Sequence, residues 1–365
     1  MGKTTSALKA FYDPTKPYDD NFDDGPTLVS PTDKPYKNSG QPKFKFLGKK
    51  LYSPFGIPAG PILNSKYVKY AFERGFDVVV YKTQRSMEFK VNRFPNVLYL
   101  DIDGDLTLAK TSKPLLGKTD TDQPIQQLSI TNSFGNPSRG PVFWVADTKK
   151  AHSYQDKGQL LISSAVGTIK EGFSNEDYYE DFAKAAGLAK SSDVEAIEIN
   201  LSCPNVANEG ILCYTLEPVI DITRRVKERI GNIPLIVKVG YYSAEQQLLL
   251  EKVIKEISPY IAAISAINTI PAPVVDKNGN QALPGPNRLV SGICGAAIKW
   301  AGLDMVKRLN QLRRKTKAEF EIVGVGGVMT PADFHHYRQA GADVVQSATG
   351  AMWNPQLAAQ IKKTI

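Results

Sequence analysis

The sequence predicts an α/β protein built as a (β/α)8 TIM barrel, with an N-terminal arm and an insertion after the second strand. Short runs of apolar and β-branched residues, typical of buried parallel strands, alternate with segments of helical periodicity. Eight such strand–helix units follow one another along the chain. A doubly wound open sheet is the alternative, but eight units joined by short turns, without a second domain, favour a closed barrel.

The chain is expected to divide into an N-terminal arm and one barrel domain. Residues 1–45 are rich in Asp, Pro, Lys, Gly and Ser without a sustained period, so we expect an extended arm that lies over the domain or is partly disordered. Residues 46–365 are expected to form the barrel. Its strands are predicted at 52–60, 77–83, 160–167, 196–201, 235–239, 262–268, 321–325 and 343–347.

The connections follow from helix signals and turn residues. A Ser174–Asp177 capping box and a Thr330–Asp333 cap each open a helix, and Gly231 and Gly341 each end one. The excursion 84–139 is too long for a plain loop and is expected to be functional or to carry small strands of its own. Residues 270–295, rich in Pro and Gly, are expected to be a loop. Further helices are predicted at 65–74, 245–257, 296–312 and 355–363.

The amino-acid composition limits the kinds of ligand and partner that we expect this protein to bind. The net charge of +8 favours anionic ligands, and the dispersed Lys and Arg residues argue against a nucleic-acid patch. No apolar run is long enough to span a bilayer or to form the core of a signal peptide, so we expect no membrane association and a cytoplasmic location. Three cysteines and three histidines show neither a disulfide framework nor metal-ligand spacing, and we expect no metal.

The segment AIEINLSCPN, residues 196–205, carries the strongest chemical signal. The strand ends in a turn at Cys203, because the following proline disfavours the helical conformation at that cysteine. A thiol at the carboxyl end of a barrel strand, with Asn200 and Asn205 on either side, is a candidate proton-transfer group. The alternative is a buried cysteine that packs as a small apolar side chain. The two flanking amides favour the functional interpretation.

Polar residues follow most of the other predicted strands and should meet at the same barrel mouth. Lys238 stands in an otherwise apolar strand and needs an anion there, since an unpaired buried charge is costly. The glycine-bearing turns after the seventh and eighth strands are suited to phosphate binding. The residues at the predicted mouth are Ala59, Gly60, Lys82, Asn132, Ser164, Asn200, Cys203, Asn205, Lys238, Asn268, Thr269, Gly326, Gly327, Ala348 and Thr349.

From about residue 46 to the C-terminus the chain resembles the dihydroorotate dehydrogenases, FMN-dependent barrels that oxidise dihydroorotate to orotate in pyrimidine biosynthesis. The most specific matches are N-L-S-C-P-N at 200–205, N-S-F-G at 132–135, Asn268–Thr269 and V-G-V-G-G at 323–327. The cysteine places the resemblance with the soluble class, and family members of this kind are homodimers. The resemblance therefore implies an FMN-binding barrel, an anionic pyrimidine substrate and a homodimer.

The resemblance also implies roles for individual residues. Cys203 would be the base that takes the C5 proton while flavin N5 accepts the C6 hydride, and Lys82 would lie against flavin and substrate. Lys238 would supply its charge to the flavin ring. The substrate would contact Lys82, Asn132, Phe134, Gly135, Asn136, Asn200, Asn205, Asn268 and Thr269. FMN would contact Ala59, Gly60, Lys82, Thr83, Ser164, Asn200, Lys238, Asn268, Ser291, Gly292, Gly326, Gly327, Ala348 and Thr349.

Several positions depart from the family pattern. Phe134 and Asn136 stand where a Met and an aliphatic residue are usual, and Ala348 replaces a phosphate-site glycine, which is tolerable if its φ is negative. The arm and the insertion near 103–123 leave the electron acceptor open among fumarate, NAD through a partner subunit, and quinone. Three alternatives remain: a dihydropyrimidine dehydrogenase-like barrel, a dihydrouridine synthase-like barrel, and a non-catalytic flavin-binding barrel.

Overall fold

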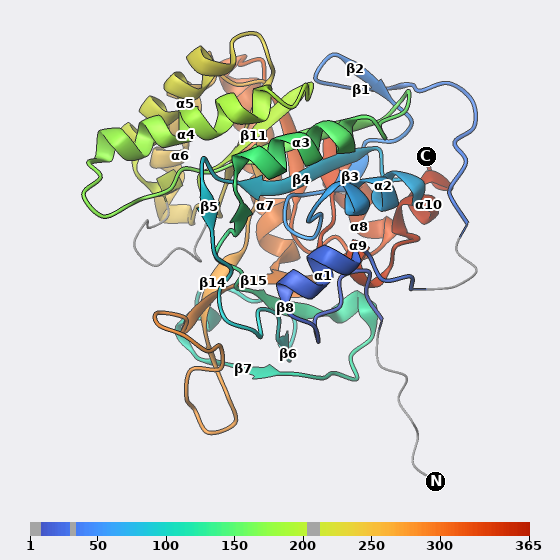
Figure 1. Cartoon of the computed structure of the whole chain (residues 1–365), viewed down its shortest axis with the longest axis vertical. Coiled ribbons are helices and arrows are strands. Elements are labelled where there is room, and N and C mark those ends of the chain that lie inside the picture. The colour runs from blue at the N-terminus through green and yellow to red at the C-terminus, as the bar shows by residue number, and fades with distance from the viewer. Residues whose placement is uncertain (1–8, 30–33, 203–211) are drawn as a thin grey trace.

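The computed structural model describes residues 9–29, 34–202 and 212–365. In this part of the chain eight parallel strands close into a barrel, in the order in which they occur along the sequence (Figure 1). The predicted (β/α)8 barrel is thereby confirmed. Its strands are β3 (Phe55–Ile57), β4 (Val78–Gln84), β10 (Leu160–Ala165), β11 (Ala196–Asn200), β12 (Leu235–Val239), β13 (Ala263–Ala266), β16 (Glu321–Val325) and β17 (Val344–Gln346).

Helices pack around the barrel where the sequence places apolar residues at helical spacing. The caps at Ser174 and Thr330 form as predicted, each with its side chain accepting a backbone N–H bond in the first turn. The helices are α2 (Ser65–Glu73), α3 (Pro141–His152), α4 (Asn175–Lys190), α5 (Leu216–Ile230), α6 (Gln247–Ile257), α7 (Lys299–Thr316), α8 (Pro331–Ala340), α9 (Thr349–Trp353) and α10 (Leu357–Lys362). Single 3₁₀ turns cover Lys110–Ser112, Ile125–Gln127, Leu212–Tyr214, Ala244–Gln246 and Ala296–Ile298.

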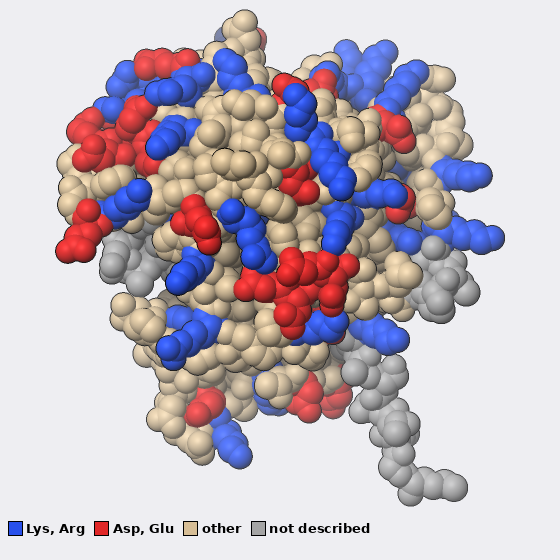
Figure 2. All heavy atoms as spheres, viewed as in Figure 1, with Lys and Arg blue, Asp and Glu red and all other residues tan. Residues whose placement is uncertain are grey.

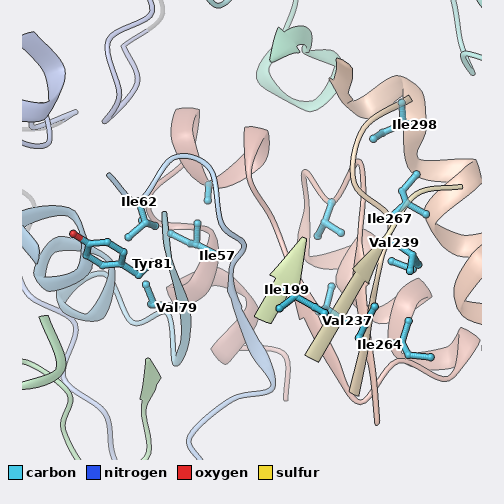
Figure 3. Close-up of a cluster of buried hydrophobic side chains, with 14 of the residues drawn as sticks. Ile57, Ile62, Val79, Tyr81, Ile199, Val237, Val239, Ile264, Ile267 and Ile298 are labelled. Carbon is cyan, nitrogen blue, oxygen red and sulfur yellow. The ribbon is translucent and has the colours of Figure 1, made fainter. Parts of the chain in front are cut away.

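Two apolar layers form the core because successive strand residues point to opposite faces. Ile199, Val237 and Ile264 lie side by side on adjacent strands and belong to the layer between barrel and helices (Figure 3). The lumen holds a separate cluster that includes Ile236 and Val323. The hairpin β1 (Phe44–Phe46) and β2 (Lys49–Leu51) adds two buried apolar side chains to that cluster, so it caps the barrel at the amino ends of the strands.

A second, five-stranded sheet stands at the other end of the molecule from the β1–β2 hairpin (Figure 1). Three of its strands come from the insertion after β4, which was expected to carry small strands. The other two come from the segment 270–295. The sheet consists of β6 (Tyr99–Leu100), β7 (Leu115–Lys118), β8 (Ser129–Asn132), β14 (Ile270–Val275) and β15 (Val290–Gly295), and a separate two-stranded ladder pairs β5 (Glu88–Phe89) with β9 (Ser138–Arg139).

The prediction of a loop over 270–295 was therefore wrong. Pro271 and Pro273 occupy alternate positions of β14, so their missing N–H groups face the same edge of the strand. The backbone N–H groups of Ala272 and Val274 face the opposite edge of the strand. Val274 donates from its backbone N to Leu289 O at 2.8 Å. β14 can consequently pair with β15 despite two prolines.

The N-terminal arm is not extended throughout. It contains α1 (Tyr18–Asp24), which ends at Gly25 with a φ of 85°. Asp19 and Asp20 lie in its first turn, where their negative charges interact favourably with the positive end of the helix dipole. Figure 2 shows acidic side chains gathered over α1. Elsewhere on this face, Lys and Arg are mixed with Asp and Glu. Tyr18 and Phe22 are buried in the main core cluster, so α1 packs against the barrel domain.

Candidate active site

The carboxyl ends of the barrel strands open into a cavity of about 1100 Å³, which includes space continuous with solvent. Its walls come from the barrel strands, from β8 and β15 of the second sheet, and from the N-terminal arm. Sixteen residues singled out from the sequence line this one cavity. They are Ala59, Gly60, Lys82, Thr83, Asn132, Phe134, Gly135, Asn136, Asn200, Lys238, Asn268, Thr269, Gly326, Gly327, Ala348 and Thr349.

Three other expected cofactor residues do not line the cavity. Ser164 lies behind the wall, with its Oγ 3.0 Å from Thr83 Oγ1 and 3.1 Å from a carboxylate oxygen of Glu198. Ser291 and Gly292 belong to β15, and a Cβ at Gly292 would lie 2.3 Å from Thr269 Oγ1. Gly292 thus allows Thr269 to occupy its place in the cavity wall. Neither Thr269 Oγ1 nor Ser291 Oγ has a hydrogen-bond partner among the described residues, although both atoms are buried.

The predicted base, Cys203, and its neighbour Asn205 lie outside the described residues. β11 ends at Asn200, and the described chain continues to Ser202, directly before the cysteine. Of the two cysteines that the structure describes, Cys213 is buried and Cys294 is partly buried. Burial raises the pKa of Cys213 to about 12 and that of Cys294 to about 11, so neither is ionised near neutral pH.

Two carboxamides are oriented by hydrogen bonds at the mouth of the barrel. Asn200 Oδ1 accepts from Asn268 Nδ2 at 3.1 Å and from the backbone N of Ser202 at 3.1 Å. Asn268 Nδ2 also donates to Ser202 O. These bonds determine which atom of each amide faces the other, and a fixed orientation is what recognition of a planar polar ligand requires.

The charged residues among the described lining of the cavity are Lys82 and Lys238, both about 4 % exposed. Lys238 is not the isolated buried charge that the sequence suggested, because Glu198 on the adjacent strand interacts with it electrostatically. Burial raises the pKa of Glu198, while Lys238 and the hydrogen bond from Ser164 oppose that rise. Two ammonium groups against one carboxylate still leave positive charge at the site, which favours an anionic ligand.

The turns after β16 and β17 form a narrow cradle. Gly326 and Gly327 have φ values of 124° and 65°, and a Cβ at Gly327 would lie 2.7 Å from the backbone N of Lys299. Tyr337 donates to Gly326 O at 2.5 Å and thereby holds the first turn. Ala348 has a φ of −92°, which satisfies the condition under which alanine can replace glycine there. The backbone of both turns can therefore approach a phosphate closely.

Sequence reasoning missed several lining residues. Cys294 and Met352 line the cavity from β15 and α9, two elements that the sequence analysis did not predict. The alternation of residues 290–295 contained a strand signal that the nearby prolines and glycines obscured. Tyr12 of the N-terminal arm also lines the cavity. No local pattern could have placed it there, because its position depends on how the arm folds back over the barrel.

The part of the chain that the structure describes contains no helix long and apolar enough to cross a membrane. Over the same residues, no group of three or more His, Cys, Asp or Glu side chains is arranged to hold a metal ion.

Comparison with known proteins identifies the family. Residues 109–365 match the family model described as "Dihydroorotate dehydrogenase". The chain is 37 % identical over 360 residues to a dihydroorotate dehydrogenase of Dictyostelium discoideum, covering 96 % of each chain. It is 31 % identical to dihydroorotate dehydrogenase A (fumarate) of Lactobacillus delbrueckii subsp. bulgaricus, covering 69 % of this chain and 76 % of the relative.

A third relative represents another group of the same enzymes. The chain is 33 % identical to the catalytic subunit of dihydroorotate dehydrogenase B (NAD(+)) of Caldicellulosiruptor saccharolyticus, over 53 % of this chain and 60 % of that subunit. The family model agrees with the barrel fold, and the near full-length relative supports the same family. The chain belongs to the dihydroorotate dehydrogenase family.

Proposed function

We propose that this protein is an FMN-dependent oxidoreductase that converts dihydroorotate to orotate in pyrimidine biosynthesis by oxidising a CH–CH bond. The observation that carries the proposal is the cavity lining: two buried lysines and a set of oriented carboxamides meet at the carboxyl ends of the barrel strands. Positive charge suits the substrate carboxylate, and amides suit the ring N–H and C=O groups. Membership of the family supports the same activity.

The described residues fit FMN in two respects. The turns at Gly326–Gly327 and Ala348–Thr349 both line the cavity, and a Cβ at Gly327 would lie 2.7 Å from the backbone N of Lys299, so the main chain stays bare at that position, which suits phosphate binding by backbone N–H groups. The buried hydroxyls of Thr269 and Ser291 have no hydrogen-bond partner among the described residues and would suit a polar ring edge nearby. Lys82, Thr83 and Lys238 would contact the ring, together with Ala59, Gly60, Asn200 and Asn268. Ser164 would act from behind them, through Thr83.

The reaction removes a proton from C5 and a hydride from C6 of dihydroorotate. When bound, FMN supplies the two-electron acceptor for the hydride. Cys203 takes the C5 proton, and the carboxamides of Asn132, Asn200, Asn205 and Asn268 hold the ring in place. Phe134, Gly135 and Asn136 close the substrate side of the cavity, and Lys82 contributes charge toward the substrate carboxylate.

The decisive experiment is anaerobic addition of dihydroorotate to the purified protein while its flavin absorbance is recorded. Bleaching of the flavin band is expected with dihydroorotate and not with dihydrouracil, which lacks the carboxylate. Bleaching by dihydrouracil alone would instead support a dihydropyrimidine dehydrogenase-like activity. Reoxidation by fumarate, quinone or NAD then identifies the electron acceptor, and a protein that binds flavin without being bleached would be non-catalytic.

The base is tested by Cys203→Ser. A thiol has a reference pKa of about 8.5, so wild-type flavin reduction should accelerate as pH rises toward that value. Serine is far less acidic, and we expect the rate at pH 7 to fall by roughly 10²- to 10⁴-fold. Cys213→Ser, in the buried core and outside the cavity lining, is the matched control and should keep the wild-type pH profile. A flat profile from about pH 6 to 10 in the wild type would argue against the thiol.

Family resemblance also supports a homodimer that works in the cytoplasm without nucleic acid. Light scattering during size-exclusion chromatography should give twice the 40.1 kDa mass of one chain. Failure to retain tRNA at physiological salt would separate this protein from the dihydrouridine synthases.

A further inference from the structure

The N-terminal arm supplies one wall of the active-site cavity through Tyr12, a residue to which the family resemblance assigns no role. Tyr12 is 2 % exposed and lines the cavity. Its ring meets that of Phe134 edge-on, with ring centroids 5.6 Å apart and planes at 89°. Edge-to-face contacts of this kind stabilise a specific geometry in addition to burying apolar area.

Phe134 belongs to the segment 132–136, which borders the proposed substrate side of the cavity and is named here the substrate loop. Its backbone is held by residues of the chain that follows β4: Asn92 N donates to Phe134 O at 3.0 Å, and Arg85 Nε donates to Asn136 O at 3.0 Å. Gly135 and Asn136 have positive φ values of 80° and 52°. These bonds restrain the main chain and leave the half-buried Phe134 side chain to be positioned by packing.

That packing comes from the arm. Tyr18 of α1 also contacts Phe134, at 5.9 Å between centroids, so two arm aromatics meet one side chain of the substrate loop. The arm in turn is fixed by Asn21, whose Oδ1 accepts from Asp13 N at 2.8 Å and whose Nδ2 donates to Asp13 O at 2.9 Å. This closed turn determines the position of the neighbouring Tyr12.

Two more contacts fasten the arm to the barrel. Phe11 N donates to the carbonyl of Met352, itself a cavity residue, at 3.0 Å. Tyr67 of α2 donates from its hydroxyl to Asn21 O at 2.9 Å. The arm segment 10–25 is therefore attached on both sides of Tyr12.

We propose that Tyr12 is a positioning residue for the substrate loop: its ring holds Phe134 in place and so gives residues 132–136 the shape that binds the pyrimidine ring. The effect on substrate rests on the proposed function, since it concerns the same site. Tyr12 acts at the substrate end and not at the phosphate cradle. Its loss should therefore weaken pyrimidine binding without loss of FMN.

The test uses full-length holoenzyme with three substitutions. Tyr12→Leu removes the ring but keeps apolar bulk, and Tyr12→Phe keeps the ring. Phe11→Leu is the matched control, because Phe11 is an equally buried arm aromatic that packs on Tyr67 and Tyr70 and does not line the cavity. The probe is orotate, titrated against the flavin absorbance, with the flavin content of each variant measured in parallel.

We expect Tyr12→Leu to raise the orotate Kd about three- to tenfold, the range that one aromatic pair supplies. Tyr12→Phe and Phe11→Leu should stay within about twofold of wild type, and flavin content should be equal in all four proteins. Parallel loss of flavin and orotate in Tyr12→Leu, or an equal effect of Phe11→Leu, would overturn the proposal, because either result indicates a general loosening of the arm.

Hydrogen–deuterium exchange tests, independently of any ligand, whether Tyr12 holds the substrate loop in place. Tyr12→Leu should accelerate exchange at the amides of residues 131–136, and Phe11→Leu should not. Unchanged exchange there overturns the proposal. If wild-type protein binds no orotate but the exchange difference is present, the proposed function fails while the positioning role of Tyr12 stands.

Discussion

The carboxamide of Asn268 donates from Nδ2 to Oδ1 of Asn200 at 3.1 Å, which joins the chain after β13 to the end of β11, past the end of the intervening strand β12. The same nitrogen reaches the carbonyl of Ser202, one residue before Cys203. The bond thus connects two predicted substrate-binding amides with the chain that carries the predicted base.

Asn268→Asp should reduce orotate affinity at least about tenfold. The new carboxylate would face Asn200 Oδ1 and Ser202 O, both acceptors, so an attractive contact becomes a repulsive one worth more than about 1.4 kcal/mol. Titration of the flavin absorbance with orotate measures the change. Asn278→Asp, in an exposed turn, is the control and should leave the Kd unaltered. A change of less than twofold in Asn268→Asp would show that the amide pair does not bear on binding.

Gly327→Ala should lower the affinity for FMN roughly five- to 100-fold, the effect of a steric conflict of about 1–3 kcal/mol. The added Cβ would lie 2.7 Å from the backbone of Lys299, in the cradle proposed for phosphate. Gly279→Ala provides a close control: Gly279 also has a positive φ, 81°, but no atom lies within 4 Å of the position that its Cβ would occupy. The measurement is the flavin-to-protein ratio after dialysis, and equal ratios in the two variants would contradict the phosphate assignment.

Arg288→Met should lower the free energy of unfolding by about 3 kcal/mol. The guanidinium is 5 % exposed and donates to backbone carbonyls, among them Ser133 O at 3.0 Å and Arg93 O at 2.7 Å, which would lose a partner. It also connects the β14–β15 region to Ser133, which lies within the substrate loop. Denaturant unfolding measures the loss. Arg314→Met, on the exposed side of α7, should cost no more than about 0.5 kcal/mol, and similar values for the two would refute the prediction.

Lys362→Met should destabilise the protein by about 3–5 kcal/mol near pH 8, because it leaves the buried carboxylate of Asp77 without its partner at 2.7 Å. Asp77→Asn combined with Lys362→Met should cost less than Lys362→Met alone, since no charge then remains buried. Lys69→Met removes one member of an exposed pair with Glu73 and should change stability by at most about 0.5 kcal/mol.

The pH dependence of this buried pair has a definite sign. Burial raises the pKa of Asp77 from 3.8 to about 6 in the folded protein, against the opposing effect of Lys362. Between about pH 6 and 4 the folded state therefore binds a proton that the unfolded state does not, and stability from this group rises as pH falls. Without Lys362 the pKa rises further, so the cost of Lys362→Met should shrink on acidification. A cost independent of pH from 8 to 5 would contradict this account.

Local sequence was sufficient for much of the site because a barrel places the ends of its strands at one mouth. Lys82, Asn200 and Lys238 could be assigned to the same cavity once their strands were recognised, and the structure brings them together. Ser164 was assigned to the same mouth but lies behind the wall, because its hydroxyl meets Thr83 and Glu198 instead. A residue's position along its strand predicts at which end of the barrel the residue lies. Its side-chain hydrogen bonds determine whether the side chain lines the cavity or stays behind the wall.

Glu198 shows a different limit. In the sequence it merely interrupts an apolar strand, and nothing local relates it to a lysine forty residues later. Parallel pairing of β11 with β12 aligns Asn200 with Lys238, so Glu198 on the same face lies near that lysine. The interaction depends on strand register, which is a property of the closed sheet.

By itself the sequence determined the barrel, its strand ends and the residue types at the mouth, because two-residue and helical periodicities are local and their alternation permits few topologies. Only the tertiary structure decided that β14 and β15 complete a second sheet, that Glu198 accompanies Lys238, and that Tyr12 closes the cavity against Phe134. Each of these depends on contacts between segments far apart in the chain, whose free energies are realised only when the whole fold brings them together.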